Sequence, residues 1–248
     1  MQTELETLWF LKRVNIFKDM TEVDLRYLER MTHMKVYGRH EQIYGQGDAG
    51  DVVYLLKEGR VKIYKLSPDG KELTLELLEP GEIFGEMALV DDSPRDTIAE
   101  TLDDSMLCIM RCRDFEIFLK KKPELAMRVT KLIGMRRRHI QNQLENLVFR
   151  SASSRLALLL LSLGEIHGVR DSRGIILNIK LSQQELANLI GTARETTSAL
   201  LNEFKRLGFI DIQRRRIKLL ESWRLKKIAD ATMTDLLLPE EPESTEPT

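Results

Sequence analysis

The most constraining feature of the sequence is a pair of short helical segments that meet at Gly191. Ser182 and Glu185 have the S-x-x-E spacing of a capping box, which predicts the start of the first helix. The second segment opens at Thr192, is apolar on one face, and is stopped by Gly208. Two short helices joined by a tight glycine turn are typical of a helix-turn-helix.

The segments on either side extend this prediction to a winged helix-turn-helix. Residues 209–212 and 217–219 have the composition of two short strands, and residues 213–216 between them form an arginine-rich turn. Upstream, Ser153 or Ser154 can cap a helix that runs to about Ile166. The whole arrangement predicts a DNA-binding domain.

The second helix of such a domain places its N-terminal residues deepest in the major groove. Arg194 can present two donors to guanine, and Glu195 can accept a hydrogen bond from cytosine. Two alternatives stay open: a capping box between Thr192 and Glu195, and a solvated helix face for Arg194. Our candidate base-reading residues are Arg194, Glu195, Thr197, Ser198 and Ala199.

Other polar and basic groups of this domain are candidates for phosphate contacts, which add affinity but carry no sequence information. They are Gln183, Thr192, Lys205, Arg214, Arg215 and Arg216.

The distribution of charge supports a nucleic-acid partner, although the chain carries a net charge of only −1. Residues 194–227 hold ten basic and four acidic side chains, whereas residues 82–104 hold eight acids and one base. Residues 239–248 carry four glutamates and three prolines, which predicts a disordered acidic tail. The near-neutral total therefore hides a basic C-terminal domain.

The N-terminal part of the chain has a different pattern of apolar residues. Residues 2–33 have a helical pattern, and from Lys35 to about Arg111 the apolar period changes to two. Glycine-containing turns recur at short intervals, which indicates an antiparallel sandwich or barrel. Residues 45–50 match G-x-G-x-x-G, but a strand pattern follows where a dinucleotide site needs a helix. We interpret these glycines as turn residues.

One segment of this β region could bind an anion. Gly85 opens a short helical turn whose N–H groups face outward, Glu86 could accept hydrogen bonds from hydroxyls, and Arg95 could neutralise a phosphate. Arg95 is also the single base among eight acids, so a structural ion pair is the alternative.

Residues 123–149 predict one helix of about 25 residues with a heptad-like apolar seam. The alternatives are a helix that lies on its own domain and a helix that pairs with a second copy, and we favour the homodimer. The candidate interface residues are Val129, Ile133, Arg136, Ile140, Leu144 and Leu147.

The sequence disfavours several classes of protein. Cys108 and Cys112 are too few for a disulfide framework or a four-ligand zinc site, and no metal is expected. No apolar run is long enough for a membrane span and the N-terminus is acidic, so we expect no membrane partner, no export signal and a cytoplasmic protein. No Ser/His/Asp set or Walker loop is present, so we expect no enzyme.

Three blocks resemble the catabolite-activator/FNR superfamily of bacterial transcription regulators: G-D-x-x-D-V-V-Y-L-L-K-E-G-R-V-K-I-Y, F-G-E-M-A-L-V-D-D-S-P-R and L-S-Q-Q-E-L-A-N-L-I-G-T-A-R-E-T-T-S-A-L-L-N-E-F-K-R-L-G-F-I. The resemblance covers roughly residues 12–222 and implies an α+β chain. Its expected parts are a cyclic-nucleotide-binding β-barrel sensor (1–122), a dimerisation helix and hinge (123–150), a winged helix-turn-helix (151–235) and a disordered acidic tail (236–248).

By the same resemblance, Gly85 and Glu86 hold a ribose, Arg95 holds a cyclic phosphate, and Arg194 and Glu195 read bases. The candidate ligand is a cyclic nucleotide. We expect no iron–sulfur cluster, because no N-terminal cysteine cluster is present. We expect no haem, because His33 and His40 alone are weak candidates for haem ligands. The effector-binding candidates are Gly85, Glu86, Met87, Arg95, Asp96, Thr97, Ile140 and Gln141.

Four positions depart from the catabolite activators. Asp96 stands where cyclic-AMP binders have Ser or Ala, Ile140-Gln141 replaces a Thr-Ser pair that contacts adenine, and Ala199 replaces a second base-reading arginine. A carboxylate at Asp96 would repel a phosphate by about 1 kcal/mol or more.

We therefore expect a homodimeric, sequence-specific DNA-binding regulator of a two-fold operator, with an effector pocket altered or vestigial for cyclic AMP. The alternative is a regulator that binds cyclic AMP or another cyclic (di)nucleotide to activate DNA binding, and a nucleotide-sensing regulatory subunit of another protein is a second class. For an activator, RNA polymerase is a further partner. Residues 149–151 are the expected hinge.

Overall fold

The computed structural model describes residues 15–91, 93–213 and 216–231. They fall into two compact units, residues 1–140 and 141–248, whose boundary lies within the long helix α4 (Pro123–Phe149). Several predictions lie outside the described residues: the helical pattern of residues 2–14, the phosphate contacts of Arg214 and Arg215, and the tail at 236–248.

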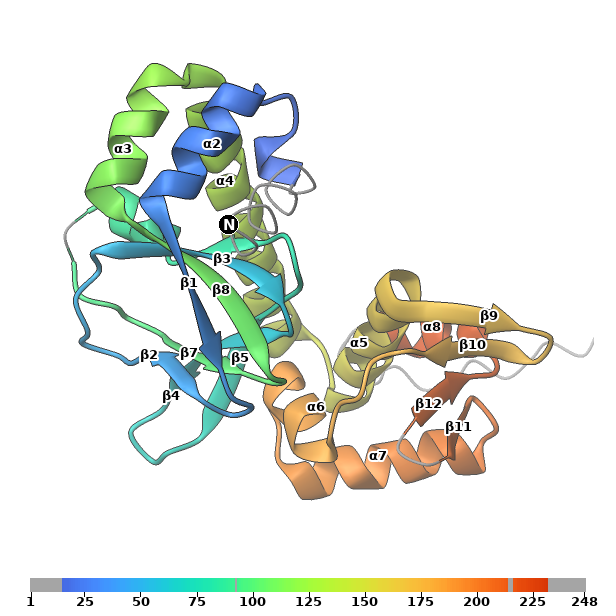
Figure 1. Ribbon diagram of the computed structural model, residues 1–248. Coiled ribbons are helices and arrows are strands. Elements are labelled where there is room, and N and C mark those ends of the chain that lie inside the picture. The colour runs from blue at the N-terminus through green and yellow to red at the C-terminus, as the bar shows by residue number, and fades with distance from the viewer. Residues whose placement is uncertain (1–14, 92, 214–215, 232–248) are drawn as a thin grey trace, which may run out of the picture. The chain divides into compact units, whose positions relative to one another are not determined.

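The first unit is built on two antiparallel four-stranded sheets that share one core (Figure 1). One sheet has the order β1 (Thr32–Tyr37), β8 (Ser105–Arg111), β3 (Val52–Glu58), β6 (Ile83–Phe84), and the other β2 (Gln42–Tyr44), β7 (Ile98–Thr101), β4 (Val61–Leu66), β5 (Glu72–Leu78). Tyr54 and Leu56 of the first sheet belong to the same buried cluster as Val61 and Ile63 of the second. The predicted β-barrel is thereby confirmed.

The sheet that contains β3 is buried on both faces. Val53 and Leu55 belong to a second core with Phe115 and Leu125, which come from helices that cover this sheet (Figure 1). A strand covered on both sides has no polar face, which explains its unbroken apolar run. The covering elements are η1 (Asn15–Phe17), α2 (Glu22–Met31), α3 (Cys112–Lys121) and the first turns of α4.

Helix α2 begins with a capping box at Thr21. The Thr21 hydroxyl accepts a hydrogen bond from the Asp24 N–H, and the Asp24 carboxylate accepts one from the Thr21 N–H. The first strand starts at Thr32, three residues before the change of period at Lys35, because Thr32 is already extended as it caps α2.

The register of β5 differs from a simple alternation. An irregularity between Ile63 and Tyr64 of β4 pairs Ile63 with Glu76, and Val61 with Leu78. Leu78 is buried in the barrel core, and Glu76 lies two residues before it, on the same face of the strand. In the sequence, Glu72, Thr74 and Glu76 alternate with Leu73, Leu75 and Leu77, which would place Glu76 on the outward polar face, but the bulge turns it inward.

The second unit is a small helical domain with one antiparallel sheet, of order β11-β12-β10-β9. Its first helix is capped by Ser151 rather than Ser153 or Ser154, because the Ser151 hydroxyl accepts from the Ser154 N–H. The hairpin partner β9 and the last helix α8 were not predicted. The elements are α5 (Ala152–His167), β9 (Gly168–Asp171), β10 (Gly174–Leu177), α6 (Gln183–Ile190), α7 (Arg194–Arg206), β11 (Ile210–Gln213), β12 (Arg216–Leu219) and α8 (Ser222–Asp230).

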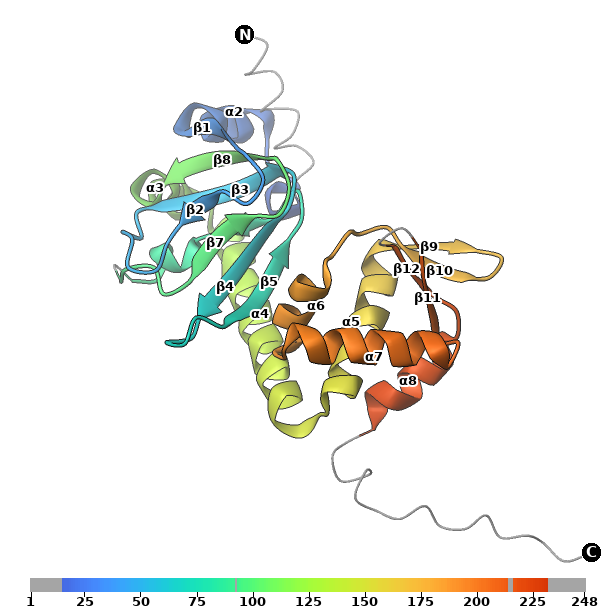
Figure 2. The same ribbon diagram turned by 90° about the horizontal axis from the view of Figure 1, so that it is seen from below.

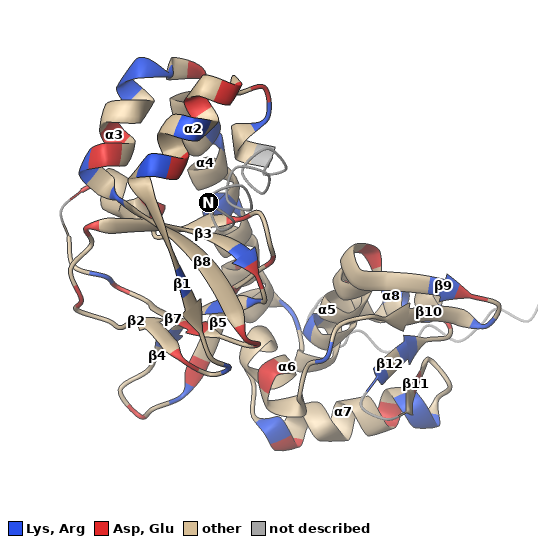
Figure 3. Ribbon diagram, viewed as in Figure 1, with Lys and Arg blue, Asp and Glu red and all other residues tan. Residues whose placement is uncertain are grey.

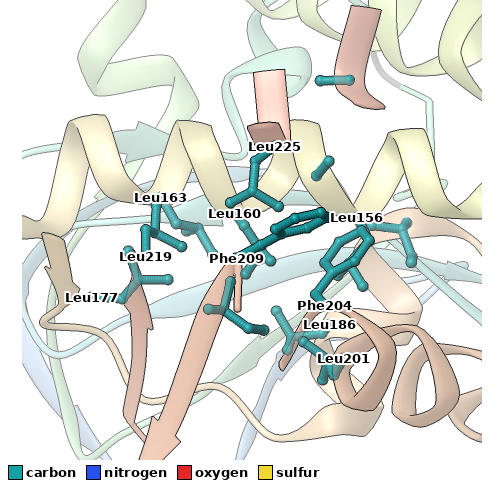
Figure 4. Packing of buried hydrophobic residues seen from close by; sticks show 14 of the residues in the cluster. Leu156, Leu160, Leu163, Leu177, Leu186, Leu201, Phe204, Phe209, Leu219 and Leu225 are labelled. Carbon is teal, nitrogen blue, oxygen red and sulfur yellow. The ribbon is translucent and has the colours of Figure 1, made fainter. Parts of the chain in front are cut away.

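The core of this unit is formed by leucines of α5 packed against the helix-turn-helix, the sheet and α8. Figure 4 shows Leu156 and Leu160 of α5 close to Phe204 of α7 and Leu225 of α8. The predicted wing is the hairpin β11–β12, which packs on this core through Ile210.

The cysteines are core residues, and the glycine-rich segment is a turn before a strand, as predicted for residues 45–50. Cys108 and Cys112 are buried in the core of the first unit, and burial raises the pKa of each thiol to about 11. The segment 45–50 leads into the strand β3, which begins at Val52, so it has no helix to receive a dinucleotide phosphate.

Candidate nucleic-acid interface and effector pocket

The turn between α6 and α7 has the geometry of a helix-turn-helix. Glu185 accepts a hydrogen bond from the Ser182 N–H at 2.5 Å, and Ser182 accepts one from the Glu185 N–H at 3.2 Å. Gly191 ends α6 with a φ of 62°, a left-handed conformation that glycine adopts without strain. α7 then buries Leu201 and Phe204 in the core. The predicted capping box and glycine turn are confirmed.

The first turn of α7 presents Arg194 and Glu195 to solvent. The N-cap is Ala193, which has no capping side chain, so the alternative capping box between Thr192 and Glu195 does not form. Within the described part of the chain, neither Arg194 nor Glu195 has an ion-pair partner. Both side chains are therefore free to meet base edges.

Thr197 cannot read bases, and its assignment was wrong. Its side chain is fully buried, and its hydroxyl donates to the Ala193 carbonyl at 3.3 Å. The helical spacing already indicates that Thr197 is buried, because it lies four residues before Leu201, on the same apolar face. Among the neighbouring positions, Ser198 is half-buried and Ala199 is exposed, and the exposed Thr196 is a candidate that the sequence analysis missed.

The candidate phosphate contacts lie around the same surface. Figure 3 shows basic residues at both ends of α7. Lys205 and Arg216 are exposed, and the Lys205 ammonium lies 3.8 Å from Asp211 and 3.5 Å from the Ile212 carbonyl of the wing. Gln183 and Thr192 are half-buried at the starts of the two helices. These roles stay predictions.

In the first unit, Arg95 is a buried cation without an acidic partner among the described residues. Its Nη1 donates to the Gly85 carbonyl at 2.9 Å and its Nη2 to the Val52 carbonyl at 2.5 Å, while its Nε is buried with no hydrogen bond. The guanidinium carbon lies 4.7 Å from the centre of the Tyr44 ring. The structural ion pair considered from sequence is therefore not formed with any described carboxylate.

Gly85 and Glu86 adjoin this guanidinium. Gly85 has a φ of 73°, and a Cβ there would lie 3.0 Å from Arg95 Nη1 and 3.2 Å from the Tyr54 ring, so only glycine fits. Gly85 precedes the short 3₁₀ helix η2 (Glu86–Leu89), as predicted. Glu86 is buried, and a second arginine engages its carboxylate.

That second arginine is Arg136 of α4, which was assigned to the dimer interface. Its Nη1 lies 2.6 Å from Glu86 Oε2, its Nε lies 3.0 Å from Glu76 Oε2, and its Nη2 donates to the Ile83 carbonyl at 2.7 Å. Burial alone would lower the pKa of Arg136, but the two carboxylates outweigh it and raise the pKa. The interface assignment was wrong because the barrel of the same unit holds this side chain.

The remaining effector candidates are less closely gathered. Thr97 is half-buried and hydrogen-bonds to Tyr44, whereas Met87 is exposed. The Asp96 side chain is 74% exposed and its carboxylate lies 2.9 Å from Lys65 Nζ. Ile140 and Gln141 are exposed on α4, and no hydrogen bond or ion pair joins them to the pocket within the described residues.

Comparison with known proteins assigns both units. A family described as cyclic nucleotide-binding domain matches residues 34–122, and a Crp-like helix-turn-helix domain matches residues 154–228. The "Cyclic AMP receptor protein" of Thermus thermophilus is 33% identical over 84% of this chain and 92% of its own length. The chain belongs to the CRP/FNR family of transcription regulators.

Other relatives agree with this assignment. The "CRP-like cAMP-activated global transcriptional regulator" of Mycobacterium tuberculosis is 27% identical over 88% of this chain and 98% of its own length. The crystal structure of a CRP-family transcriptional regulator from Thermus thermophilus superposes with a TM-score of 0.67 at 28% identity, over 81% of this chain and 99% of that one. The chain is thus a CRP-family DNA-binding transcription regulator, and its family consists of regulators rather than enzymes.

The first turns and the later turns of the long helix α4 of this CRP-family protein lie in different environments. Val129 is buried in the core of its own unit and Ile133 packs partly against it, so Val129 was wrongly assigned to the dimer interface. Further along, Ile140 and Leu144 are 41% and 61% exposed, and Leu147 is half-buried. The first turns therefore lie on their own domain, whereas the later turns expose apolar side chains.

The described residues contain neither a candidate membrane span nor a candidate metal cluster. Within that part of the chain, no helix is both long enough and apolar enough to cross a membrane. The same residues contain no group of three or more His, Cys, Asp or Glu side chains that could hold a metal ion.

Proposed function

We propose that this CRP-family regulator binds a two-fold DNA site as a homodimer and reads bases through the first turn of α7. The observation that carries this proposal is the exposed, unpaired Arg194 and Glu195 at the start of that helix. The arginine fork matches guanine O6 and N7, and the glutamate can accept from cytosine N4. Ala199 offers only a methyl group, so the preferred base there differs from that of a regulator with arginine at this position.

The later turns of α4 support the homodimer. Ile140, Leu144 and Val148 are all more than 40% exposed, and they recur at four-residue spacing along one face. An apolar stripe of this kind on a long helix is the seam of a two-helix coiled coil. A dimer with two-fold symmetry also presents two recognition helices to the two halves of one operator.

The pocket supports an anionic effector. A buried guanidinium is costly unless a counter-charge neutralises it, and Arg95 has none among the described residues. A ligand phosphate would supply that charge and complete the hydrogen bonds of Arg95. Glu86, one residue after Gly85, could accept from ligand hydroxyl groups in exchange for Arg136.

We further propose that this effector is not cyclic AMP. Asp96 should repel a ligand phosphate less than the sequence suggests, because its carboxylate is exposed and paired with Lys65. By the family resemblance, Ile140 stands in place of a threonine that contacts adenine, and its side chain has no polar atom to recognise the adenine amino group. The alternative, a regulator activated by cyclic AMP or another cyclic (di)nucleotide, is favoured by the unneutralised charge of Arg95 alone.

The route from sensor to DNA runs through the end of α4. Arg155 donates from Nη1 to the Arg150 carbonyl at 2.8 Å and from Nε to the Ile190 carbonyl at 2.8 Å. The first carbonyl follows α4 and the second ends α6, so one side chain ties the long helix to the helix-turn-helix. A change in the direction of α4 would therefore reorient α7, with the predicted hinge at residues 149–151.

Isothermal titration calorimetry with cyclic AMP, cyclic GMP and cyclic di-GMP tests the effector proposal. We expect cyclic AMP to bind no more tightly than the other two, and Arg95→Ala to abolish binding of any ligand that does bind. Tight cyclic-AMP binding that is lost in Arg95→Ala would instead establish the alternative. Sequence-selective retardation of a palindromic DNA library tests the DNA-binding proposal independently of any ligand.

A further inference from the structure

The pocket holds an inward carboxylate that the proposed function does not use. Glu76 of β5 is mostly buried and lies 3.0 Å from Arg136 Nε, while Glu86 lies 2.6 Å from Arg136 Nη1. The third donor edge of Arg136 is taken by the Ile83 carbonyl at 2.7 Å. One guanidinium is thus shared by two carboxylates, and each of its three nitrogens has a partner in the protein.

Because two carboxylates share Arg136, the net charge of the pocket can be counted. Arg95 contributes a positive charge without an acidic partner among the described residues, and Arg136 faces both Glu76 and Glu86. With both carboxylates ionised, these four groups are neutral in total before any ligand binds. A singly charged anion at Arg95 would therefore leave the buried cluster negative, which is unfavourable at low dielectric.

We propose that Glu76 is a specificity-determining residue that weakens the binding of cyclic nucleotides by keeping Arg136 neutralised. A ligand that binds must then bring hydrogen-bond donors that replace Arg136 on the carboxylates of Glu76 and Glu86. The inference rests on the proposed role of the pocket as an effector site. It assigns to Glu76 the repulsion that the sequence pattern assigns to Asp96.

The protonation of Glu76 provides a signature of this role. Burial raises the pKa of Glu76, against the opposing effect of Arg136 and with a further contribution from Glu86 and Glu82. As the pH falls towards this raised pKa, Glu76 becomes neutral and its repulsion of an anion disappears. Cyclic-AMP affinity should therefore increase as the pH falls, and Glu76→Gln should show less of this dependence.

The test compares cyclic-AMP binding by calorimetry in four full-length proteins, the wild type and three variants, at several pH values. Glu76→Gln keeps the shape of the side chain and removes its charge. Glu72→Gln is the matched control, because Glu72 lies on the same strand but pairs with Lys62 at 2.8 Å and not with Arg136. We expect Glu76→Gln to bind cyclic AMP roughly tenfold more tightly than the wild type, and Glu72→Gln to bind as the wild type does.

Each other outcome decides against the inference. Equal affinity of Glu76→Gln and wild type, an equal gain in Glu72→Gln, or no binding by Glu76→Gln at millimolar cyclic AMP would show that Glu76 does not set specificity. Glu76→Asp retains the charge and should keep the wild-type affinity, which separates charge from folding. Tight binding by the wild type would contradict the proposed effector preference, while the ratio between variant and wild type would still decide the role of Glu76.

Discussion

Two buried arginines in one pocket have different partners, and the difference separates their functions. Arg136 is neutralised by Glu76 and Glu86, so it fastens α4 to the barrel. Arg95 donates only to uncharged carbonyls and is left with an unused Nε. Because a buried charge without a counter-charge is unfavourable, Arg95 is the group that a ligand can stabilise.

At the DNA interface, Arg194 is the residue whose loss should matter most for sequence preference. We expect Arg194→Ala to lower discrimination at one base pair of each half-site by about 1–3 kcal/mol, because the bidentate contact with guanine is lost. Binding to a randomised operator library, followed by sequencing, measures this. The control is Glu203→Ala, which removes an exposed charge from the same helix away from its first turn. Unchanged preference in Arg194→Ala would show that the recognition helix has another register.

At the scale of elements, the sequence predicted those whose ends carry local signals. α6 and α7 were found because a capping box and the turn at Gly191 act within a few residues. The facing of Glu76 was missed because a bulge that depends on the neighbouring strand reverses it. Arg136 was misassigned for a related reason: a heptad pattern shows which residues share a face, but not which of two surfaces that face contacts.

The prediction at the scale of elements concerns the later turns of α4. Leu144→Glu should convert the dimer to a monomer, because it buries a charge in the proposed apolar seam without a partner. Sedimentation equilibrium measures the mass of the particle directly. Asn142→Glu introduces the same charge at an exposed position two residues earlier, and it should leave the dimer intact. A Leu144→Glu protein that still sediments as a dimer would place the interface elsewhere.

At the scale of the whole molecule, the sign of the charge changes along the chain while the total stays at −1. The segment around the pocket is acidic, and the helix-turn-helix with its wing, drawn from below in Figure 2, is basic (Figure 3). Net charge therefore says little about the partners of this protein. The basic unit attracts a DNA polyanion, whereas the proposed anionic effector would be attracted to the other unit by the buried Arg95.

This separation predicts how salt should act on DNA binding. Each phosphate contact makes the logarithm of the association constant fall by about 0.9 for each unit in the logarithm of salt concentration. Lys205→Gln and Arg216→Gln should therefore each make the slope of a dimer less steep by roughly 1.8, with no change in base preference. Fluorescence anisotropy across a salt series measures the slope, and Lys120→Gln on α3 of the sensor unit should leave it unchanged. If Lys205→Gln alters base preference and leaves the slope as it was, Lys205 reads bases rather than phosphates.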